Sequence, residues 1–380
     1  MIQVPLSTTQ RALLVFPSLE LGGAERQGLH VARFLRARGW EVNIWSTLGH
    51  EGAIADECKN LGIATAAHRF LWPCRRSSLV RDTWRLVWAL RRLRPNVILS
   101  YCASPNVGCG LASRLAGVKA CIWGQRDVQG LRGDRVERFA FRRASAVICN
   151  AEHEVEYLER MLGKTRAAIH VVHNGLDLVP ARKTGAEWRR KLQLPDGVPV
   201  GVMLANFRPE KDHATLLRAW TRLLEGVAEG AVRPCLVLAG APHSTHGDVM
   251  RLAMQLGIAD WVRLPGQVKD VTGLLQACTV GILSSHREGL SNAVLEYMAC
   301  GLPVVATDLA GNREALGDGA GESVVAGEDV EGLADLLRTL LTDTGLRDVL
   351  GAKNRARASA EFSVERMCEA TLRVIEACLG

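Results

Sequence analysis

The chain has 380 residues, of which 48% are hydrophobic and 23% charged, and its formal net charge is +7. This ordinary globular composition excludes a disordered, collagen-like or low-complexity protein, and the length favours two domains. No apolar run approaches the roughly 20 residues that span a membrane as a helix. Eleven cysteines without CxxC spacing favour reduced thiols over disulfides or a zinc site.

The positive charge is concentrated in the first half of the chain. Residues 1–178 contain 25 Lys/Arg and 15 Asp/Glu, a net of +10, whereas the remainder contains 22 and 25, a net of −3. This asymmetry suggests an anionic partner for the first half: a phosphate-bearing acceptor, an acidic membrane surface or nucleic acid. The first apolar run, 12–16, has strand length and no basic segment before it, so we expect no secretory signal and a cytoplasmic protein.

Short apolar runs alternate with amphipathic segments along the chain. The expected strands of the first half are 12–16, 41–45, 96–101, 119–123, 146–149 and 169–172, and those of the second half are 198–204, 235–240, 262–266, 280–285 and 303–307. Strands that alternate with helices predict parallel sheets covered on both faces. A turn-rich stretch at 173–185 separates the halves. The fold class is therefore α/β, with two doubly wound Rossmann-like domains.

One helical segment, residues 74–95, is rich in arginine and tryptophan. Trp84 and Trp88 are four positions apart, as are Arg81 and Arg85, so one helix face could be aromatic and another cationic. Interfacial helices on anionic lipid have this pattern. An ordinary core-facing helix with a solvated basic side has it as well, and a lipid-linked acceptor would favour the interfacial alternative.

The segment "REGLSNAVLEYMACGLP" (287–303) contains two glutamates, Glu288 and Glu296, with seven residues between them. Glu296 falls in an expected helix and Glu288 in the loop before it. Unpaired N–H groups and a partial positive charge make a helix start a natural seat for an anion such as phosphate. A plain cap would need only Ser291 or Asn292 and would leave Glu288 unexplained.

Four segments resemble the retaining glycosyltransferases of the GT4 family, which have the GT-B fold. They are "SLELGGAER" (18–26), "HNGLD" (173–177), "NFRPEKDHATLLRAW" (206–220) and "VRLPGQVKDVTGLLQACTVGILSSHREGLSNAVLEYMACGLPVVATDLAGNREAL" (262–316). The resemblance covers nearly the whole chain and implies two facing domains with a cleft between them. Residues 1–178 would form the basic, acceptor-side domain and 179–362 the nucleotide-sugar domain. Residues 363–380 would form a helix that packs back on the first domain.

The resemblance also assigns roles in the second domain. Glu288 would accept hydrogen bonds from the donor sugar hydroxyls and Glu296 from the two ribose hydroxyls, since a carboxylate offers only acceptors. Backbone groups expected to approach the donor are those of Gly266, Gln267 and Val268 at its base, and those of Gly289, Leu290, Ser291 and Asn292 at its sugar and diphosphate.

Lys211 follows a strand at a helix start, where its charge would reach the diphosphate. The family pairs this lysine with an arginine five residues earlier, but this chain has Asn206 there. Arg208 is therefore expected to supply the second cation, and the two would stabilise the leaving group. The chain has no D-x-D sequence, which fits a site without a metal or other cofactor.

In the first domain, Gly22 and Gly23 follow the first strand and precede a helix, so backbone there can approach a phosphate or sugar. Many relatives have a histidine after the strand at 119–123, where this chain has "WGQRDVQG". Arg126 is the candidate for the corresponding catalytic contact to sugar or acceptor, with an Arg126–Asp127 salt bridge as an equal alternative. Tyr101 ends the preceding strand and would line the same cleft.

The sequence therefore predicts a retaining glycosyltransferase that moves a sugar from a UDP-, GDP- or ADP-sugar to a hydroxyl of a glycan or lipid-linked acceptor. The expected setting is polysaccharide, lipopolysaccharide or other glycoconjugate assembly, in the cytoplasm or at the inner face of the membrane. Two alternatives remain: a nucleotide-sugar epimerase of the same architecture, and a non-catalytic partner protein, which the departures at Asn206 and at the family histidine favour. Nucleic-acid binding is not expected, because the basic half has no recognition motif.

Overall fold

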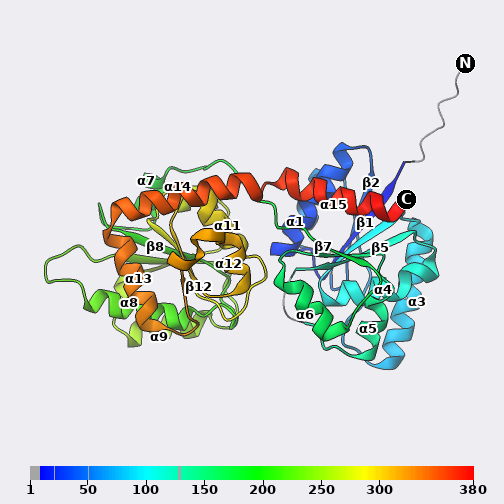
Figure 1. Ribbon diagram of the computed structural model, residues 1–380, viewed down its shortest axis with the longest axis horizontal. Coiled ribbons are helices and arrows are strands. Elements are labelled where there is room, and N and C mark those ends of the chain that lie inside the picture. The colour runs from blue at the N-terminus through cyan, green and yellow to red at the C-terminus, as the bar shows by residue number, and fades with distance from the viewer. Residues whose placement is uncertain (1–8, 21, 50, 127–129) are drawn as a thin grey trace, which may run out of the picture. The chain divides into compact units, whose positions relative to one another are not determined.

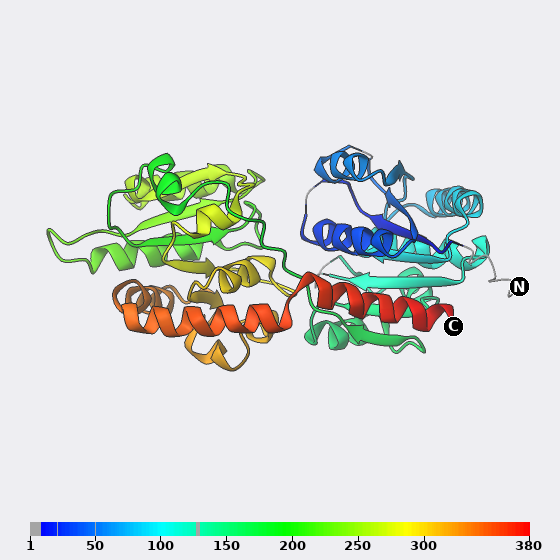
Figure 2. The same ribbon diagram turned by 90° about the horizontal axis from the view of Figure 1, so that it is seen from above.

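The computed structural model describes residues 9–20, 22–49, 51–126 and 130–380. The chain divides into two compact units: unit 1 contains residues up to Gly175 together with Val364–Gly380, and unit 2 is Leu176–Ser363. Each unit has one parallel sheet with helices packed on it (Figures 1 and 2). The prediction of two doubly wound Rossmann-like units is confirmed.

Unit 1 has a seven-stranded sheet in the order β3-β2-β1-β4-β5-β6-β7, with every neighbouring pair parallel. Its strands are β1 (Arg11–Phe16), β2 (Glu41–Ser46), β3 (Ala64–Ala67), β4 (Val97–Tyr101), β5 (Ala120–Gln125), β6 (Ala146–Cys149) and β7 (Ala168–Val171). Its helices are α1 (Gly23–Ala37), α2 (Ala53–Asn60), α3 (Arg76–Leu93), α4 (Ala103–Ala116), α5 (Arg135–Phe141), α6 (His153–Leu162) and α15 (Val364–Leu379).

Strand residues of unit 1 alternate between two hydrophobic cores. Leu14 and Leu99 pack with residues of α1, α2 and α15 on one face of the sheet. Leu13 and Ile98 pack with residues of α3 and α4 on the other face. This alternation follows from the two-residue repeat of a strand, and it makes α15 part of the core of unit 1 although unit 2 separates it in sequence.

Helix α3 contacts the sheet through one side only. Leu86, Val87 and Leu90 are buried, whereas Trp84 and Trp88 are exposed. The helix therefore has the core-facing side that the ordinary interpretation requires, but its tryptophans are not on that side. Within the described ranges, no helix is both long and apolar enough to cross a membrane.

Unit 2 has a six-stranded parallel sheet in the order β10-β9-β8-β11-β12-β13. Its strands are β8 (Val200–Leu204), β9 (Cys235–Ala239), β10 (Val262–Gly266), β11 (Val280–Leu283), β12 (Val304–Thr307) and β13 (Val324–Val325). Its α-helices are α7 (Gly185–Lys191), α8 (His213–Glu225), α9 (His246–Gln255), α10 (Val271–Leu275), α11 (Asn292–Ala299), α12 (Ala310–Leu316), α13 (Val330–Thr342) and α14 (Thr344–Glu361).

The order of each sheet reverses once, between β1 and β4 in unit 1 and between β8 and β11 in unit 2. At such a position the loops that follow the two strands lead away in opposite directions. The carboxyl ends of the strands then border a crevice, which is where open α/β sheets bind ligands.

Helix α11 lies directly on β11 at Gly281. A Cβ added to Gly281 would lie 2.2 Å from Cγ of Tyr297. The Tyr297 hydroxyl accepts a hydrogen bond from Leu204 N at 2.6 Å and donates one to Ile282 O at 3.1 Å. One tyrosine thus ties α11 to both strands of the switch point, and only glycine leaves room for its ring.

Replacement of Gly281 by alanine should therefore lower the free energy of unfolding by about 1–3 kcal/mol, the usual cost of overpacking a core. Denaturant unfolding of the full chain measures it. Gly321→Ala is the matched control, because an added Cβ at Gly321 meets no atom within 4 Å. Equal midpoints for the two variants would contradict the packing argument.

Candidate functional site

The loops after β8 and β11 meet in an ion pair. Lys211 Nζ contacts Oε1 of Glu288, and Ser285 Oγ donates a hydrogen bond to the same oxygen at 2.7 Å. The lysine side chain is 22% exposed and that of the glutamate 9%. Because both charges are largely removed from water, they attract more strongly than a pair on the open surface. The structure thus brings two predicted site residues together at the switch point of unit 2.

Backbone hydrogen bonds hold these two loops in register. Asp212 N donates to Ser284 O at 3.0 Å, and His286 N donates to Glu210 O at 2.9 Å. Asp212 also caps α8, since its carboxylate accepts from Thr215 N at 3.1 Å. The positions of Lys211 and Glu288 therefore depend on the adjacent strands and not only on their own contact.

Ser285 is a site residue that the sequence reasoning missed. Its backbone N donates to Thr307 Oγ1 at 3.0 Å, which fixes it to the end of β12 while its hydroxyl contacts Glu288. The available signal was its spacing, three residues before Glu288 in "SSHREG". A serine there can orient the carboxylate of the loop it belongs to.

The loop after β8 accounts for the departure at Asn206. Asn206 Oδ1 accepts a hydrogen bond from Ala241 N at 2.9 Å, so this side chain joins the loops after β8 and β9. Arg208 is exposed, and its carbonyl accepts from Lys211 N at 3.0 Å. Within the described part of the chain its guanidinium has no ion-pair partner, so a cation on the same loop as Lys211 remains available for an anionic ligand.

Most of the other residues that are predicted to contact the donor lie in α11 or in the loop before it. Ser291 is 5% exposed, but its side chain makes no capping hydrogen bond, so it is not the plain cap that the sequence allowed. Glu296 is 8% exposed and Leu290 4%. Asn292 begins the helix and Gly289 precedes it in the loop. Since the side chain of Leu290 is buried, only its backbone can face a ligand.

The predicted base-contact residues lie at the same edge of the sheet, two strands from β8. Gly266 ends β10 with φ +75°, a conformation that favours glycine, and its carbonyl accepts from Gly240 N at 3.0 Å. Gln267 is exposed and Val268 half-buried. These three residues are placed where a ligand at the carboxyl edge would extend, but their contact with a base stays a prediction.

His213 packs inside the loop that contains Lys211. Its ring stacks on Phe207 with centroids 4.7 Å apart, and its Nδ1 donates to Lys211 O at 2.7 Å. The imidazole is 2% exposed, and burial lowers the pKa of His213 to about 4. The sequence reasoning did not single out this neutral histidine, because nothing in "EKDHA" distinguishes it from a surface residue.

In unit 1, Arg126 lies with Tyr101 and Asn174. Arg126 Nη1 donates to Asn174 Oδ1 at 2.6 Å, and its Cζ lies 5.6 Å from the centre of the Tyr101 ring. Its Nε is buried and has no hydrogen-bond partner among the described residues. The alternative salt bridge falls on Asp127, which lies outside the described residues. Tyr101 is 2% exposed and stacks on Phe16, and burial raises the pKa of its phenol to about 12.

Gly22 and Gly23 are at the start of α1, as predicted for the chain after β1. Gly22 precedes the helix and Gly23 begins it. A Cβ at Gly22 would lie 2.3 Å from Oε2 of Glu25. A carboxylate of the chain itself thus approaches this helix start, and the role of the two glycines toward a ligand stays a prediction.

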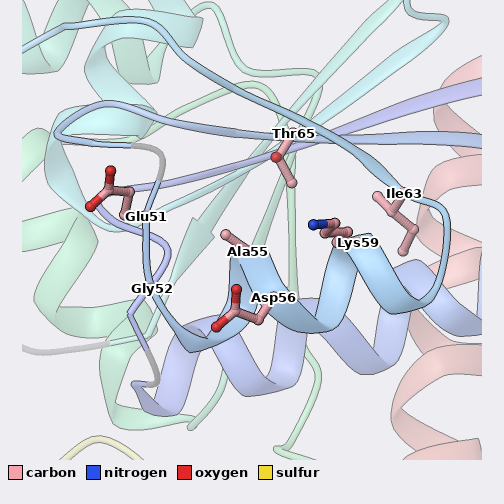
Figure 3. Close-up of a pocket in the computed structure, with 7 residues that line it drawn as sticks. All are labelled: Glu51, Gly52, Ala55, Asp56, Lys59, Ile63 and Thr65. Atoms are coloured by element: carbon pink, nitrogen blue, oxygen red, sulfur yellow. The ribbon is translucent and has the colours of Figure 1, made fainter.

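A separate surface hollow in unit 1 has no predicted site residue in its lining. Its volume is about 560 Å³, and it lies beside α2 and β3 (Figure 3). The lining residues are Glu51, Gly52, Ala55, Asp56, Lys59, Ile63 and Thr65. Over the described ranges, no group of three or more His, Cys, Asp or Glu side chains is arranged to hold a metal ion.

Two doubly wound parallel-sheet units in one chain are the architecture of the GT-B fold. Residues 198–343 match the profile of the glycosyl transferases group 1, and residues 21–179 match the profile of glycosyltransferase family 4. Each unit of the chain thus matches a glycosyltransferase family over most of its length.

Individual relatives are glycosyltransferases, and a solved structure shares the fold. The chain is 27% identical to the lipopolysaccharide core biosynthesis glycosyltransferase LpsE of Rhizobium meliloti, over 93% of this chain and 96% of that protein. It is 30% identical to the D-inositol 3-phosphate glycosyltransferase of Streptosporangium roseum, over 57% of this chain and 52% of that protein. It spans about half the length of this and similar curated relatives. Anabaena Alr3699/HepE, solved with UDP-glucose, shares the fold with a TM-score of 0.83 and 19% identity, over 97% of this chain and 99% of that chain.

The low pKa of His213 predicts a loss of stability in acid. The unfolded chain takes up a proton near the ordinary value of 6.5, whereas the folded chain does so only near 4. The contribution of His213 to the free energy of unfolding is therefore complete above pH 6.5. It falls as the pH drops from 6.5 to about 4, by roughly 2–3 kcal/mol.

Urea unfolding at about pH 7.5 and about pH 4.5 measures this loss. The variant His213→Phe keeps an aromatic ring against Phe207 but cannot titrate, so its stability should depend on pH less than that of the parent by the same amount. An identical pH dependence in parent and variant would show that His213 is not the group responsible.

Proposed function

We propose that the chain is a retaining glycosyltransferase that transfers a sugar from a nucleotide diphosphate sugar to a hydroxyl of a glycan or lipid-linked acceptor. The observation that carries this proposal is the Lys211–Glu288 pair at the carboxyl edge of unit 2. The role of LpsE in lipopolysaccharide core biosynthesis supports an acceptor used in glycoconjugate assembly. The UDP-glucose complex of Alr3699/HepE supports a nucleotide sugar as donor, and UDP-, GDP- and ADP-sugars are the candidates.

In this proposal the ion pair holds both charges in place before the donor arrives. Lys211 then turns its ammonium group to the diphosphate, and Glu288 accepts hydrogen bonds from sugar hydroxyls while Ser285 keeps its carboxylate oriented. A site organised in advance does not have to reorganise as the reaction begins. When the donor binds, Lys211 exchanges Glu288 for the diphosphate and Glu288 exchanges Lys211 for sugar hydroxyls, so neither of the largely buried charges is left without a hydrogen-bond partner.

The bond that breaks joins the anomeric carbon to a diphosphate oxygen, and its electron pair stays on the diphosphate. Lys211 and Arg208 stabilise the negative charge that accumulates there. The acceptor hydroxyl forms the new bond on the same face of the sugar and gives its proton to the leaving phosphate oxygen. Configuration at the anomeric carbon is retained, and no protein base is required.

Other residues bind rather than react. Glu296 holds the ribose hydroxyls, and the backbone of residues 289–292 approaches the diphosphate. Arg126 is proposed to contact the sugar or acceptor from unit 1, which is supported by its buried Nε without a hydrogen-bond partner among the described residues. A guanidinium nitrogen in that state gains a hydrogen bond when an oxygen ligand approaches it.

Thermal unfolding with a panel of UDP, GDP, ADP and their sugars tests donor binding. A ligand at a hundred times its dissociation constant should stabilise the native chain by about 2.7 kcal/mol. The measurement is made with EDTA present, because the proposed site holds the diphosphate with cations of the chain itself. Stabilisation by no member of the panel, with or without Mg²⁺, would contradict a nucleotide-sugar site.

Replacement of Glu288 by alanine should reduce turnover roughly 100-fold, since a misplaced sugar loses alignment with the acceptor. Nucleotide binding should be largely retained, because Glu288 contacts the sugar and not the nucleotide. Glu229→Ala, an exposed acid of the same unit, is the matched control and should change neither quantity. Thermal unfolding of each variant shows that the fold persists.

Two outcomes would replace the proposal. If the parent chain binds nucleotide but turns over no donor with any acceptor, the non-catalytic alternative is correct. If it releases an altered sugar without an acceptor, the epimerase alternative is correct. Analysis of the anomeric configuration of the product by NMR tests retention separately.

A further inference from the structure

We propose that unit 1 docks on an anionic lipid bilayer through the outer face of α3 and the adjoining end of α4. This docking face is defined by the apolar residues Val80, Trp84, Trp88 and Leu115 and by the arginines that flank them. The proposal rests on the surface of unit 1 alone and does not depend on the activity proposed for unit 2.

The apolar residues of the docking face are strongly exposed. The exposed fractions are 60% for Val80, 51% for Trp84, 68% for Trp88 and 46% for Leu115. Among the described residues of unit 1 only Leu48 and Phe139 are comparable large hydrophobics, and Phe139 lies on α5, which packs against α4. Figure 1 shows α3, α4 and α5 as neighbouring helices of this unit. Burying such side chains in an interface removes them from water at a gain in free energy.

The spacing of these residues produces one continuous stripe. Val80, Trp84 and Trp88 are four positions apart along α3, so they lie along one side of the helix. Arg91 continues the stripe: its Cζ lies 6.0 Å from the centre of the Trp88 ring, and its Nη2 donates to Leu115 O at 3.0 Å. Arg91 thus joins the end of α3 to the exposed leucine of α4.

Positive charge surrounds the stripe, and one acid offsets part of it. Arg76, Arg81, Arg85 and Arg92 are exposed residues of α3. The acid of this helix, Asp82, is 8% exposed, and it points inward while Arg81 and Arg85 contact it at 2.9 and 3.7 Å. Helix α4 contains no acid, and the acid of α5, Glu137, is fully buried. The outer face therefore has a net positive charge.

The terminus of the stripe adds a basic hollow. Arg91, Arg94 and Lys119 are among the residues that line it, between the C-terminal ends of α3 and α4. Three cations around a surface depression suit a phosphate group of a lipid head. Tryptophan and arginine also both prefer the interface between lipid heads and acyl chains.

The charge of the face selects the bilayer over other occupants. A second copy of the chain would bring two cationic faces together, which like-charge repulsion opposes. Nucleic acid would be attracted by the arginines, but its phosphate backbone does not complement an apolar stripe of aliphatic and aromatic side chains. An anionic bilayer complements both properties at once.

Vesicle flotation of the full chain tests the proposal. Binding to vesicles of phosphatidylcholine with about one-third phosphatidylglycerol should be about tenfold or more tighter than to pure phosphatidylcholine. The double variant Trp84→Ser/Trp88→Ser should weaken binding about tenfold, and Arg76→Gln/Arg92→Gln by roughly fivefold for each arginine. The matched control is Met254→Ser/Val349→Ser, which removes residues of unit 2 that are 63% and 65% exposed, and it should bind like the parent.

Four results would overturn the proposal. The first is that the parent chain does not float with anionic vesicles, and the second is that the tryptophan variant floats as well as the parent. The third is that the parent is a dimer and the tryptophan variant a monomer, which would assign the face to a second copy of the chain. The fourth is that a DNA duplex displaces the chain from the vesicles and binds the parent and the tryptophan variant equally, which would assign the face to nucleic acid. Unchanged thermal unfolding of each variant ensures that a loss of binding is not a loss of folding.

Discussion

The parallel arrangement of the strands decides where chemistry can occur in this chain. When all neighbours in a sheet are parallel, all carboxyl ends lie at one edge, and only the loops that leave this edge can meet. In unit 2 the order reverses between β8 and β11, and the pair formed by Lys211 and Glu288 spans the two diverging loops. Backbone hydrogen bonds from Asp212 N and His286 N also join these two loops, so the sheet holds the loops that position both charged side chains. A reactive pair placed in this way needs no long loop of its own to stay in position.

The strands that the sequence predicts include all those in the interior of the two sheets. A central strand of a parallel sheet is a continuous apolar run, and "CLVLA" at 235–239 or "AVIC" at 146–149 has this signature with bounds within two residues of the prediction. The two strands that were missed, β3 and β13, are edge strands of their sheets. β3 is "ATAA" and mostly exposed, and β13 has two residues. An edge strand can lack an apolar run, as these two do, and then gives no signal, whereas the edge strands β7 and β10 were predicted.

Most members of the candidate site were predictable from the sequence, Ser285 and His213 excepted, but their contacts were not. The sequence assigns Glu288 to the donor sugar and Lys211 to the diphosphate. The two residues are 77 positions apart in the chain and belong to different family motifs, so the sequence does not relate them to each other. That they contact each other follows from strand order, which no local pattern contains. Asn206 illustrates the same limit: its side chain is required by the neighbouring loop at Ala241, and a motif comparison records it only as a missing arginine. Local spacing predicts a residue's type of chemistry, whereas its partner is set by the register of distant strands.

The membership of α15 in unit 1 has a consequence for the order in which the protein is made. Met367, Cys368, Val374 and Ile375 are buried in the same core as β1, but they are synthesised after all of Leu176–Ser363. On the ribosome, unit 1 therefore waits with an uncovered apolar groove while unit 2, whose residues are consecutive, can already complete its own core. The half of the chain that is translated first is the one that finishes folding last, and during that interval its exposed groove is where a chaperone would have reason to bind.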